Sequence, residues 1–269
     1  MNTIVSKEFP EAKGIVICGD IHGDFIQLAY KCCIQYGMTD TLIIVAGDCG
    51  FGFYRQGYYE KVYEKCRKRF AEANNWIVFV RGNHDNPAYF KEGCVKYKRW
   101  MTTPDYSVIK VCGHSILCVG GATSVDRMYR ITDMHWHPVN SDEPLAPNVY
   151  WPDERPVFDE IQLEAIDKLF RIDTVVTHTA PSFCEMKSHQ GLHDWAIRDE
   201  DLLDDVKNER RVMNQLHEFL IARNHPLHNW FYGHFHQSWH QEIDGVQYNM
   251  LDCMELRELR TEREMERYL

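Results

Sequence analysis

The stretch that decides the fold of this chain spans residues 14–23 and reads GIVICGDIHG. Its first five residues carry no charge and end at a glycine, and such a short apolar run predicts a buried β-strand over residues 14–18. Asp20 and His22 follow at the carboxyl end of this strand, where the flanking glycines allow the backbone to turn tightly. These two side chains can therefore turn toward one ion together.

The same arrangement recurs along the first half of the chain. Apolar runs at residues 42–46 and 76–80 predict two further buried strands, and residues 25–36 and 58–73 have helix-compatible spacing. Fully apolar strands that alternate with helices are typical of an α/β fold, with a parallel sheet covered on both faces. Functional side chains collect at the carboxyl ends of such strands. Those ends carry Gly47-Asp48 and Gly82-Asn83-His84-Asp85.

The second half predicts shorter strands and further helices. Strands are expected over residues 95–100, 106–112, 115–119, 174–177 and 230–232, a final hairpin over 239–243 and 246–251, and helices over 161–170 and 199–224. His178 follows one of these strands, and His234 and His236 follow another. A highly charged C-terminal helix is expected over residues 254–268. No repeat or linker interrupts the chain, so we expect one domain over residues 1–269.

The least regular stretch is an insertion over residues 120–159, which holds five prolines and several aromatic residues. A loop of this length inside a compact domain is uncommon and often functional. Two interpretations remain open. The stretch either covers apolar sheet surface or forms a lid or wall for the substrate.

Seven side chains of metal-ligand type fall in five short clusters, each placed where a predicted strand ends. They are Asp20, His22, Asp48, Asn83, His178, His234 and His236. Oxygen and imidazole ligands without a thiolate suit two adjacent Mn, Fe or Zn ions better than a structural zinc, which prefers closed, cysteine-rich sites. Asp48 is a suitable bridge, because its carboxylate can place one oxygen on each ion.

Together the clusters resemble the full signature of the calcineurin-like metallophosphoesterases. The resemblance rests on Gly19-Asp20-x-His22-Gly23, Gly47-Asp48, Gly82-Asn83-His84-Asp85, His178 and Gly233-His234-x-His236. It implies a four-layer α/β/β/α sandwich. It also implies one ion held by Asp20, His22, Asp48 and His236, and a second held by Asp48, Asn83, His178 and His234. His84 is then the non-ligand histidine of the catalytic site, and Asp85 is expected to orient His84 or its loop.

The function that this resemblance implies is metal-dependent hydrolysis of a phosphoester. Two ions roughly 3.5–4 Å apart would bind the phosphate oxygens and lower the pKa of a shared water, whose bridging hydroxide would attack phosphorus. His84 would protonate or hydrogen-bond the leaving oxygen. The expected substrate is a phosphorylated small molecule or nucleotide, as a monoester or diester. A nuclease, a Ser/Thr-type protein phosphatase and an inactive metal-bound binding module remain alternatives.

The sequence departs from the related Ser/Thr protein phosphatases after the second cluster. Those enzymes continue with an Asp-Arg pair that partners the catalytic histidine and grips the phosphate, whereas Phe51-Gly52 stand here. Arg81 does match that subfamily, although an ion pair behind the site is an equally good interpretation. Arg127 and Arg130 could supply the missing phosphate contact, because a planar guanidinium suits bidentate phosphate binding. Surface salt bridges are the alternative role for both.

The charge balance and the cysteines limit partners and location. A net charge of -10 does not attract nucleic acid or an anionic membrane at long range, so nucleic acid is possible as a substrate but not favoured. No window approaches the roughly 18 apolar residues of a membrane-spanning helix. Residues 1–13 lack the apolar run of a signal peptide, and the ten cysteines fit reduced thiols, so we expect a cytoplasmic protein. The oligomeric state stays open.

Overall fold

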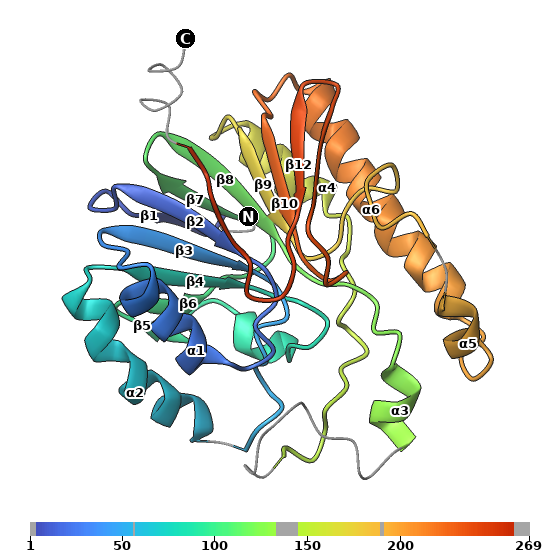
Figure 1. The fold of residues 1–269 in the computed structure, drawn as a ribbon. Coiled ribbons are helices and arrows are strands. Elements are labelled where there is room, and N and C mark those ends of the chain that lie inside the picture. The colour runs from blue at the N-terminus through green and yellow to red at the C-terminus, as the bar shows by residue number, and fades with distance from the viewer. Residues whose placement is uncertain (1–3, 56, 133–144, 189–190, 261–269) are drawn as a thin grey trace.

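Two β-sheets lie face to face in the centre of the molecule, with helices on both outer sides (Figure 1). The computed structural model describes residues 4–55, 57–132, 145–188 and 191–260. Within these residues the strands form a six-stranded sheet, in the order β13-β2-β3-β4-β6-β5, and a seven-stranded sheet, in the order β1-β7-β8-β9-β10-β12-β11.

The six-stranded sheet is built around the apolar runs of the first half of the chain. Its strands are β2 (Gly14–Cys18), β3 (Thr41–Ala46), β4 (Trp76–Val80), β5 (Lys96–Tyr97), β6 (Trp100–Thr102) and β13 (Leu256–Glu258). The four central strands β2, β3, β4 and β6 are parallel, and β5 and β13 pair antiparallel at the two edges. The predicted parallel core of this sheet is therefore confirmed.

The seven-stranded sheet comes mainly from the second half of the chain. Its strands are β1 (Ser6–Glu8), β7 (Ser107–Val111), β8 (His114–Val119), β9 (Thr174–Thr177), β10 (Asn229–Tyr232), β11 (Trp239–Ile243) and β12 (Val246–Met250). The strands β8, β9, β10 and β12 are parallel, and β7 and β11 pair antiparallel with β8 and β12. The predicted hairpin at the end of the chain is β11 and β12.

The strand β3 shows why residues 42–46 are all apolar. Ile43 and Val45 on one face pack with Phe25 of α1 (Phe25–Tyr30) and Val62 of α2 (Tyr58–Glu72). Ile44, on the opposite face, belongs to the core between the two sheets. Because successive side chains of a strand point to opposite faces, a strand covered on both sides has no position for a polar residue.

A third core closes the outer face of the seven-stranded sheet. Leu163 of α4 (Glu160–Asp167) and Leu216 of α6 (Leu202–Ala222) pack there with Val175 of β9 and Trp230 of β10. Figure 1 shows the resulting order of layers, with α1 and α2 outside one sheet and α4 and α6 outside the other. The predicted four-layer α/β/β/α sandwich is confirmed.

The predicted C-terminal helix over residues 254–268 is wrong in its described part. Residues 256–258 form β13, in which Leu256 pairs with Cys18 of β2, and Leu259 is buried. The charged pattern favours a helix locally, but the open edge of β2 offers backbone hydrogen-bond partners, which outweigh a weak local preference. Residues 261–268 lie outside the described residues.

Smaller differences occur elsewhere in the chain. The helix expected over 25–36 is α1 followed by one π-helical segment, η1 (Lys31–Gln35), and the strand expected over 95–100 is divided into β5 and β6. Part of the irregular stretch 120–159 forms a helix, α3 (Arg127–Thr132), whereas residues 133–144 lie outside the described residues. Two short helices that the sequence did not suggest are η2 (Pro87–Phe90) and α5 (Leu192–Ala196).

Candidate metal centre

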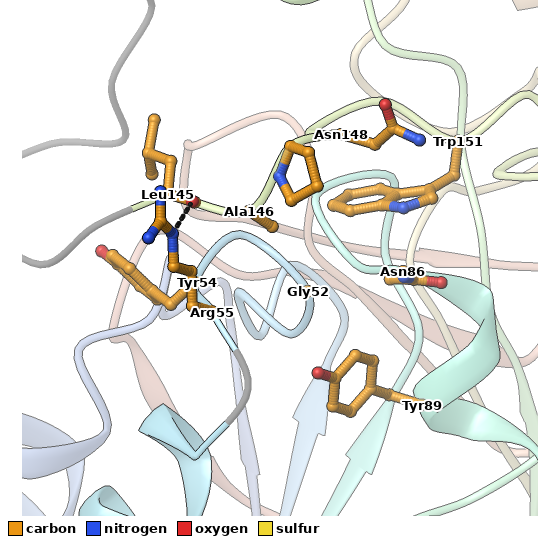
Figure 2. Close-up of a pocket in the computed structure, with 10 residues that line it drawn as sticks. Gly52, Tyr54, Arg55, Asn86, Tyr89, Leu145, Ala146, Asn148 and Trp151 are labelled. Atoms are coloured by element: carbon orange, nitrogen blue, oxygen red, sulfur yellow. Dashed lines mark hydrogen bonds between the residues drawn. The ribbon is translucent and has the colours of Figure 1, made fainter.

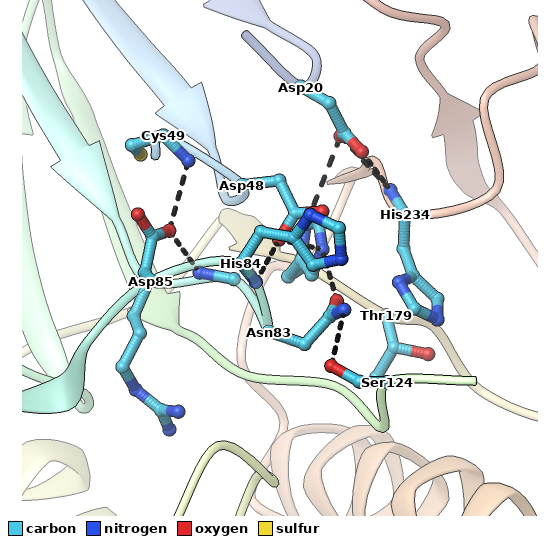
Figure 3. A network of polar contacts seen from close by, with 12 residues as sticks. Asp20, Asp48, Cys49, Asn83, His84, Asp85, Ser124, Thr179 and His234 are labelled. Carbon is cyan, nitrogen blue, oxygen red and sulfur yellow. Dashed lines mark hydrogen bonds and ion pairs between the residues drawn. The ribbon is translucent and has the colours of Figure 1, made fainter. Parts of the chain in front are cut away.

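All seven predicted ligand residues lie just beyond the carboxyl ends of five strands, β2, β3, β4, β9 and β10. Figure 3 labels four of them, Asp20, Asp48, Asn83 and His234. Within the seven-stranded sheet, the backbone N–H of Gly233 after β10 donates to the carbonyl of His178 after β9 over 3.1 Å. The side chain of His178 then brings the two sheets together. His178 Nδ1 lies 2.8 Å from the carbonyl of Ala46 at the end of β3. With its proton on Nδ1, the ring presents the lone pair of Nε2 to the centre, as metal-ligating histidines commonly do.

The first donor group combines Asp20, His22, Asp48 and His236, whose ligand atoms lie within 4.8 Å of one another. His236 Nε2 is 3.1 Å from a carboxylate oxygen of Asp20 and 3.0 Å from His22 Nε2. Asp20 and Asp48 are buried, whereas His236 is exposed. This is the set that the resemblance assigns to one ion, and the structure brings all four side chains together.

The second donor group forms around His178, which is fully buried. His178 Nε2 lies 3.0 Å from Asn83 Oδ1 and 3.0 Å from Asp48 Oδ1, so Asp48 belongs to both groups. The ring of His234 is 5.0 Å from the ring of His178, and its backbone N–H donates to the carboxylate of Asp20 over 3.0 Å. The two sets thus adjoin at Asp48.

The electrostatics of the centre fit bound cations. Burial alone would raise the pKa of Asp48, but His178, His84 and His22 outweigh burial and hold that pKa well below its usual range. Burial likewise opposes a charge on His178, yet Asp48 and Asp20 raise the pKa of its imidazole to about 9. Two buried carboxylates therefore attract positive charge, and the oxygen and nitrogen donors around them suit divalent ions of the Mn, Fe or Zn type.

The backbone of the centre is held in sparsely populated conformations. His22, Asp48, His234 and His236 have positive φ angles of 44°, 46°, 72° and 50°. Such angles are uncommon for residues with a side chain and cluster at functional sites, where the surrounding structure enforces them. Gly82 is required for a different reason. Its backbone packs closely against Asp48, and a Cβ there would lie 2.1 Å from Asp48 Oδ1.

The orientation of Asn83 depends on residues that sequence reasoning missed. Its amide Nδ2 donates to Ser124 Oγ over 3.0 Å, and Ser124 Oγ in turn donates to a carboxylate oxygen of Glu154 over 2.6 Å. Because the amide nitrogen is engaged in this way, Asn83 Oδ1 is turned toward His178. These hydrogen bonds link Asn83, Ser124 and Glu154, which are distant in sequence, and no local sequence motif indicates them. Cys253, near His22 and His236, was missed for the same reason.

His84 lies beside the donor groups. Its backbone N–H donates to Asp48 Oδ1 over 2.7 Å, and its ring centroid is 5.2 Å from that of His22. Its Nε2 is 3.8 Å from a carboxylate oxygen of Asp126. The sequence places Phe51-Gly52 where the Ser/Thr phosphatases carry the aspartate that partners their catalytic histidine, and in this structure Asp126 approaches His84 instead.

Asp85 holds the loops that carry Asp48 and His84. Its buried carboxylate accepts hydrogen bonds from the backbone N–H groups of Cys49, Gly50, Phe51 and Gly82, over 2.8–3.0 Å. Burial, and then the charge of Asp48, raises the pKa of Asp85 to about 6. These contacts fit the expected role in orienting the loop.

The three arginines expected at the substrate are all buried and paired with carboxylates. Arg81 Nη2 lies 2.8 Å from Asp105. Arg127 binds the carboxylate of Asp199 through Nε and Nη2, and Asp205 through Nη1 over 2.6 Å.

Arg130 contacts one of the proposed ligand residues, because its Nη1 lies 3.5 Å from the carbonyl of Asn83. Its Nε lies 3.1 Å from Asp126, its Nη2 lies 3.5 Å from Glu154, and it also donates to Ser124 Oγ. Arg130 thereby joins the residue beside His84 to the residues that orient Asn83.

A hollow of about 770 Å³ opens among the segments that follow β3 and β4 and residues 145–151 (Figure 2). Gly52, Asn86, Tyr89 and Trp151 are among the residues that line it. Phe53 stands between this hollow and the centre, because its ring is 5.2 Å from Trp151 and 5.8 Å from His84. Trp151 lines this hollow and also belongs to the core over the six-stranded sheet, so both interpretations of the irregular stretch remain predictions.

An α/β/β/α sandwich with an Asp/Asn/His donor set at its strand ends defines a metal-dependent hydrolase. The chain belongs to the calcineurin-like phosphoesterase family, whose model matches residues 14–238. The match includes all seven donor residues, and the protein is accordingly a metal-dependent phosphoesterase.

The solved structure of TT1561 from Thermus thermophilus has the same fold. It is 13% identical with a TM-score of 0.50, over 93% of this chain and 99% of that one. Two further structures are similar at lower scores. Phosphopantetheinyl hydrolase from Mycobacterium tuberculosis is 14% identical with a TM-score of 0.43, over 91% and 96%. GAP50 of Plasmodium is 10% identical with a TM-score of 0.37, over 89% and 71%. No curated protein matches the sequence of this chain.

Proposed function

We propose that this protein hydrolyses a phosphoester of a small molecule or nucleotide at two divalent ions of the Mn, Fe or Zn type. The observation that carries the proposal is the pair of donor groups that share Asp48. Asp20, His22, Asp48 and His236 would hold one ion, and Asp48, Asn83, His178 and His234 the other. When bound, the ions supply Lewis acidity and a water of lowered pKa.

The residues around the donors prepare the site for this reaction. Asp85 fixes the loop after β3, and Ser124 turns the amide oxygen of Asn83 inward. His84 is not a member of either donor group in this assignment, and we propose that its Nε2 gives a proton to the leaving oxygen. Asp126, 3.8 Å from that nitrogen, would hold the ring in place.

We propose that Arg127 affects substrate binding indirectly. Its ion pairs with Asp199 and Asp205 hold α3 in place. Both carboxylates paired with it are largely buried, and removal of the guanidinium takes away the cation that binds Asp199, whereas Asp205 keeps its ion pair with Arg155. Breaking a buried ion pair costs about 3–5 kcal/mol, and we expect Arg127→Ala to lower the free energy of unfolding by that order. Chemical denaturation and kcat/KM should be measured on the same preparations. A variant of unchanged stability that loses kcat/KM would instead make Arg127 a direct phosphate ligand.

The proposed activity is tested by a screen of the metal-reconstituted protein. The panel contains phosphomonoesters, phosphodiesters, nucleotides, a phosphopeptide and single-stranded DNA, and the readout is released phosphate or product. We expect turnover of small phosphoesters that disappears with Asp48→Asn. Faster turnover of the phosphopeptide or DNA would favour the protein phosphatase or nuclease alternatives. A protein that binds metal and turns over none of these would be a binding module.

We also propose a reducing, cytoplasmic location. All ten cysteines are thiols in the structure, including the adjacent pair Cys32 and Cys33. Burial raises the pKa of Cys32 to about 12, which keeps this thiol protonated and unreactive. Among the described residues, none of the helices has the length and apolarity required to cross a membrane. Thiol titration of protein from gently lysed cells would test the location, since disulfides in fresh lysate would contradict it.

A further inference from the structure

A second cavity, of about 590 Å³, adjoins the metal centre on the side of α6. His234 lines it together with the next residue, Phe235, and both follow β10. Its opposite walls are α6 and the segment around Lys187 that comes after β9. A molecule bound at the donor groups can therefore extend past His234 into this cavity.

The cavity gathers positive charge in a chain of net charge -10. Lys187, Lys207, Arg210 and Arg211 line it, and Glu209 is the one acidic residue among its lining residues. The Glu209 carboxylate is already engaged, because it accepts hydrogen bonds from the Thr179 hydroxyl over 2.9 Å and from a backbone N–H. In the part of the chain that is described, no carboxylate pairs with Lys187 or Arg211. Lys207 pairs with Asp204 over 3.3 Å, so Lys187 and Arg211 are the cations that this cavity presents without a paired carboxylate among the described residues.

Arg210 is the buried cation of this cavity, whereas Lys187, Lys207 and Arg211 are exposed. Only 7% of Arg210 is exposed. Its Nη atoms donate to the carbonyls of Pro181, Cys184 and Met186 over 2.7–3.0 Å. Its Nε has no hydrogen-bond acceptor within the described residues, and no carboxylate there lies within ion-pair distance of its guanidinium. Burial lowers the pKa of Arg210, and the nearby charges of Glu209 and Glu185 offset this only in part.

The remaining wall is apolar. Val125, Val206 and the ring of Phe235 line it, and that ring lies 5.0 Å from the guanidinium carbon of Arg210. An arginine held over an aromatic ring is fixed in orientation and suited to phosphate recognition. The cavity thus combines a surface for an organic group with a cluster of cations at one place.

We propose that this cavity binds a second phosphate group on the leaving part of the substrate, so that the substrate class is a small organic bisphosphate. The proposal rests on the proposed function, because the scissile phosphate must lie at the donor groups. The organic spacer would pass His234 and contact the apolar wall. Arg210, Lys187 and Arg211 would neutralise the second phosphate, which carries between one and two negative charges at neutral pH.

The test compares alkanediol bisphosphates with the monophosphates of the same diols, with propane, butane and hexane spacers. Initial rates give kcat/KM for the metal-loaded protein, corrected for the two equivalent esters of each bisphosphate. For at least one spacer we expect the bisphosphate to exceed the monophosphate by about tenfold or more, the effect of one charge-assisted hydrogen bond. Equal values for every spacer would overturn the proposal.

The variant Lys187→Glu/Arg211→Glu reverses two exposed charges of the cavity and leaves the buried Arg210 in place. We expect it to bring the ratio of bisphosphate to monophosphate kcat/KM to about one. The matched control, Lys61→Glu/Lys65→Glu, makes the same change of charge on exposed positions of α2 and should keep the wild-type ratio. A ratio that is the same in both variants would contradict a phosphate site in this cavity.

Direct binding separates this proposal from the proposed function. A hydrolysis-resistant propane, butane or hexane bisphosphonate is titrated into each protein by calorimetry. If no phosphoester is turned over, the proposed function is wrong. The titration still tests whether the cavity binds a phosphate group, because it does not depend on turnover. We expect Lys187→Glu/Arg211→Glu to weaken binding of the best bisphosphonate by about tenfold or more, relative to the α2 control. Equal affinity in the two variants would overturn the proposal.

Discussion

His84 is the residue on which the proposed chemistry depends most. It lies against the donor groups through its backbone contact with Asp48, and the assignment gives its ring no ion to bind. We expect His84→Ala to keep the metal content and to lower kcat by about 10²–10⁴-fold, the usual contribution of a general acid. The loss should be larger for poor leaving groups than for good ones, because good leaving groups need no proton. Metal analysis and steady-state kinetics measure both effects.

The control for this variant is His228→Ala, which removes an exposed histidine before β10. It should change neither metal content nor kcat. If His84→Ala lost metal in proportion to its activity, His84 would be a ligand, and the division of the site into seven donors and one acid would be wrong.

Glu154 gives the protein a pH-dependent stability. Burial, opposed by Arg130, raises its pKa from 4.5 to about 7. The folded state then binds the proton more tightly than the unfolded chain, so this stabilisation is complete below pH 4.5 and is lost as pH rises to about 7. The contribution of Glu154 to the free energy of unfolding should fall by about 3 kcal/mol over that range.

Glu154→Gln removes this titration while keeping a side chain of the same size. The difference between the two proteins isolates Glu154, because every other group titrates in both. We expect chemical denaturation between pH 5 and pH 8 to show a shallower decline in the variant. Parallel curves would mean that Glu154 does not titrate in this range.

At the residue scale, the convergence of the proposed donors could be predicted, and the contacts that support them could not. Asp20, Asp48 and His178 each lie within two residues of the end of a predicted strand, so their position in the sequence indicates that they converge. Ser124 and Asp126 reach the centre from a loop without regular structure, and their contacts with Asn83 and His84 depend on tertiary packing. The pairing of Arg127 with Asp199, far apart in sequence, has the same origin.

At the scale of elements, the loop after β4 approaches the end of β3 very closely. A Cβ at Gly82 would lie 2.1 Å from both the backbone nitrogen and Oδ1 of Asp48. We expect Gly82→Ala to push these loops apart and to lose bound metal, measured by elemental analysis. Gly14→Ala is the control, because its Cβ would meet Thr41 Oγ1 at an ordinary 3.4 Å. Wild-type metal content in Gly82→Ala would show that Asp48 tolerates displacement.

Elements buried on both sides were predicted best. β2, β4 and β9 begin and end where the apolar runs do, because complete burial leaves a continuous signal in the sequence. The edge strand β13 was mistaken for a helix, since it is short, charged and defined by its partner β2. Local sequence carries little information about such an edge.

At the scale of the whole molecule, the order of the layers follows from three separate cores. One lies beneath α1 and α2, one between the sheets, and one beneath α4 and α6. This stack brings the ends of β2, β3 and β4 beside those of β9 and β10, which belong to different sheets. The fold thereby joins donors from both halves of the chain into one centre.

The central claim is that this centre holds two ions that share Asp48, and metal stoichiometry tests it most directly. Elemental analysis of metal-replete protein should approach two ions per chain. Asp48→Ala should lose at least one of them, because its carboxylate belongs to both donor groups. A wild-type stoichiometry fixed at one ion per chain, with Asp48→Ala still binding that ion, would contradict the account.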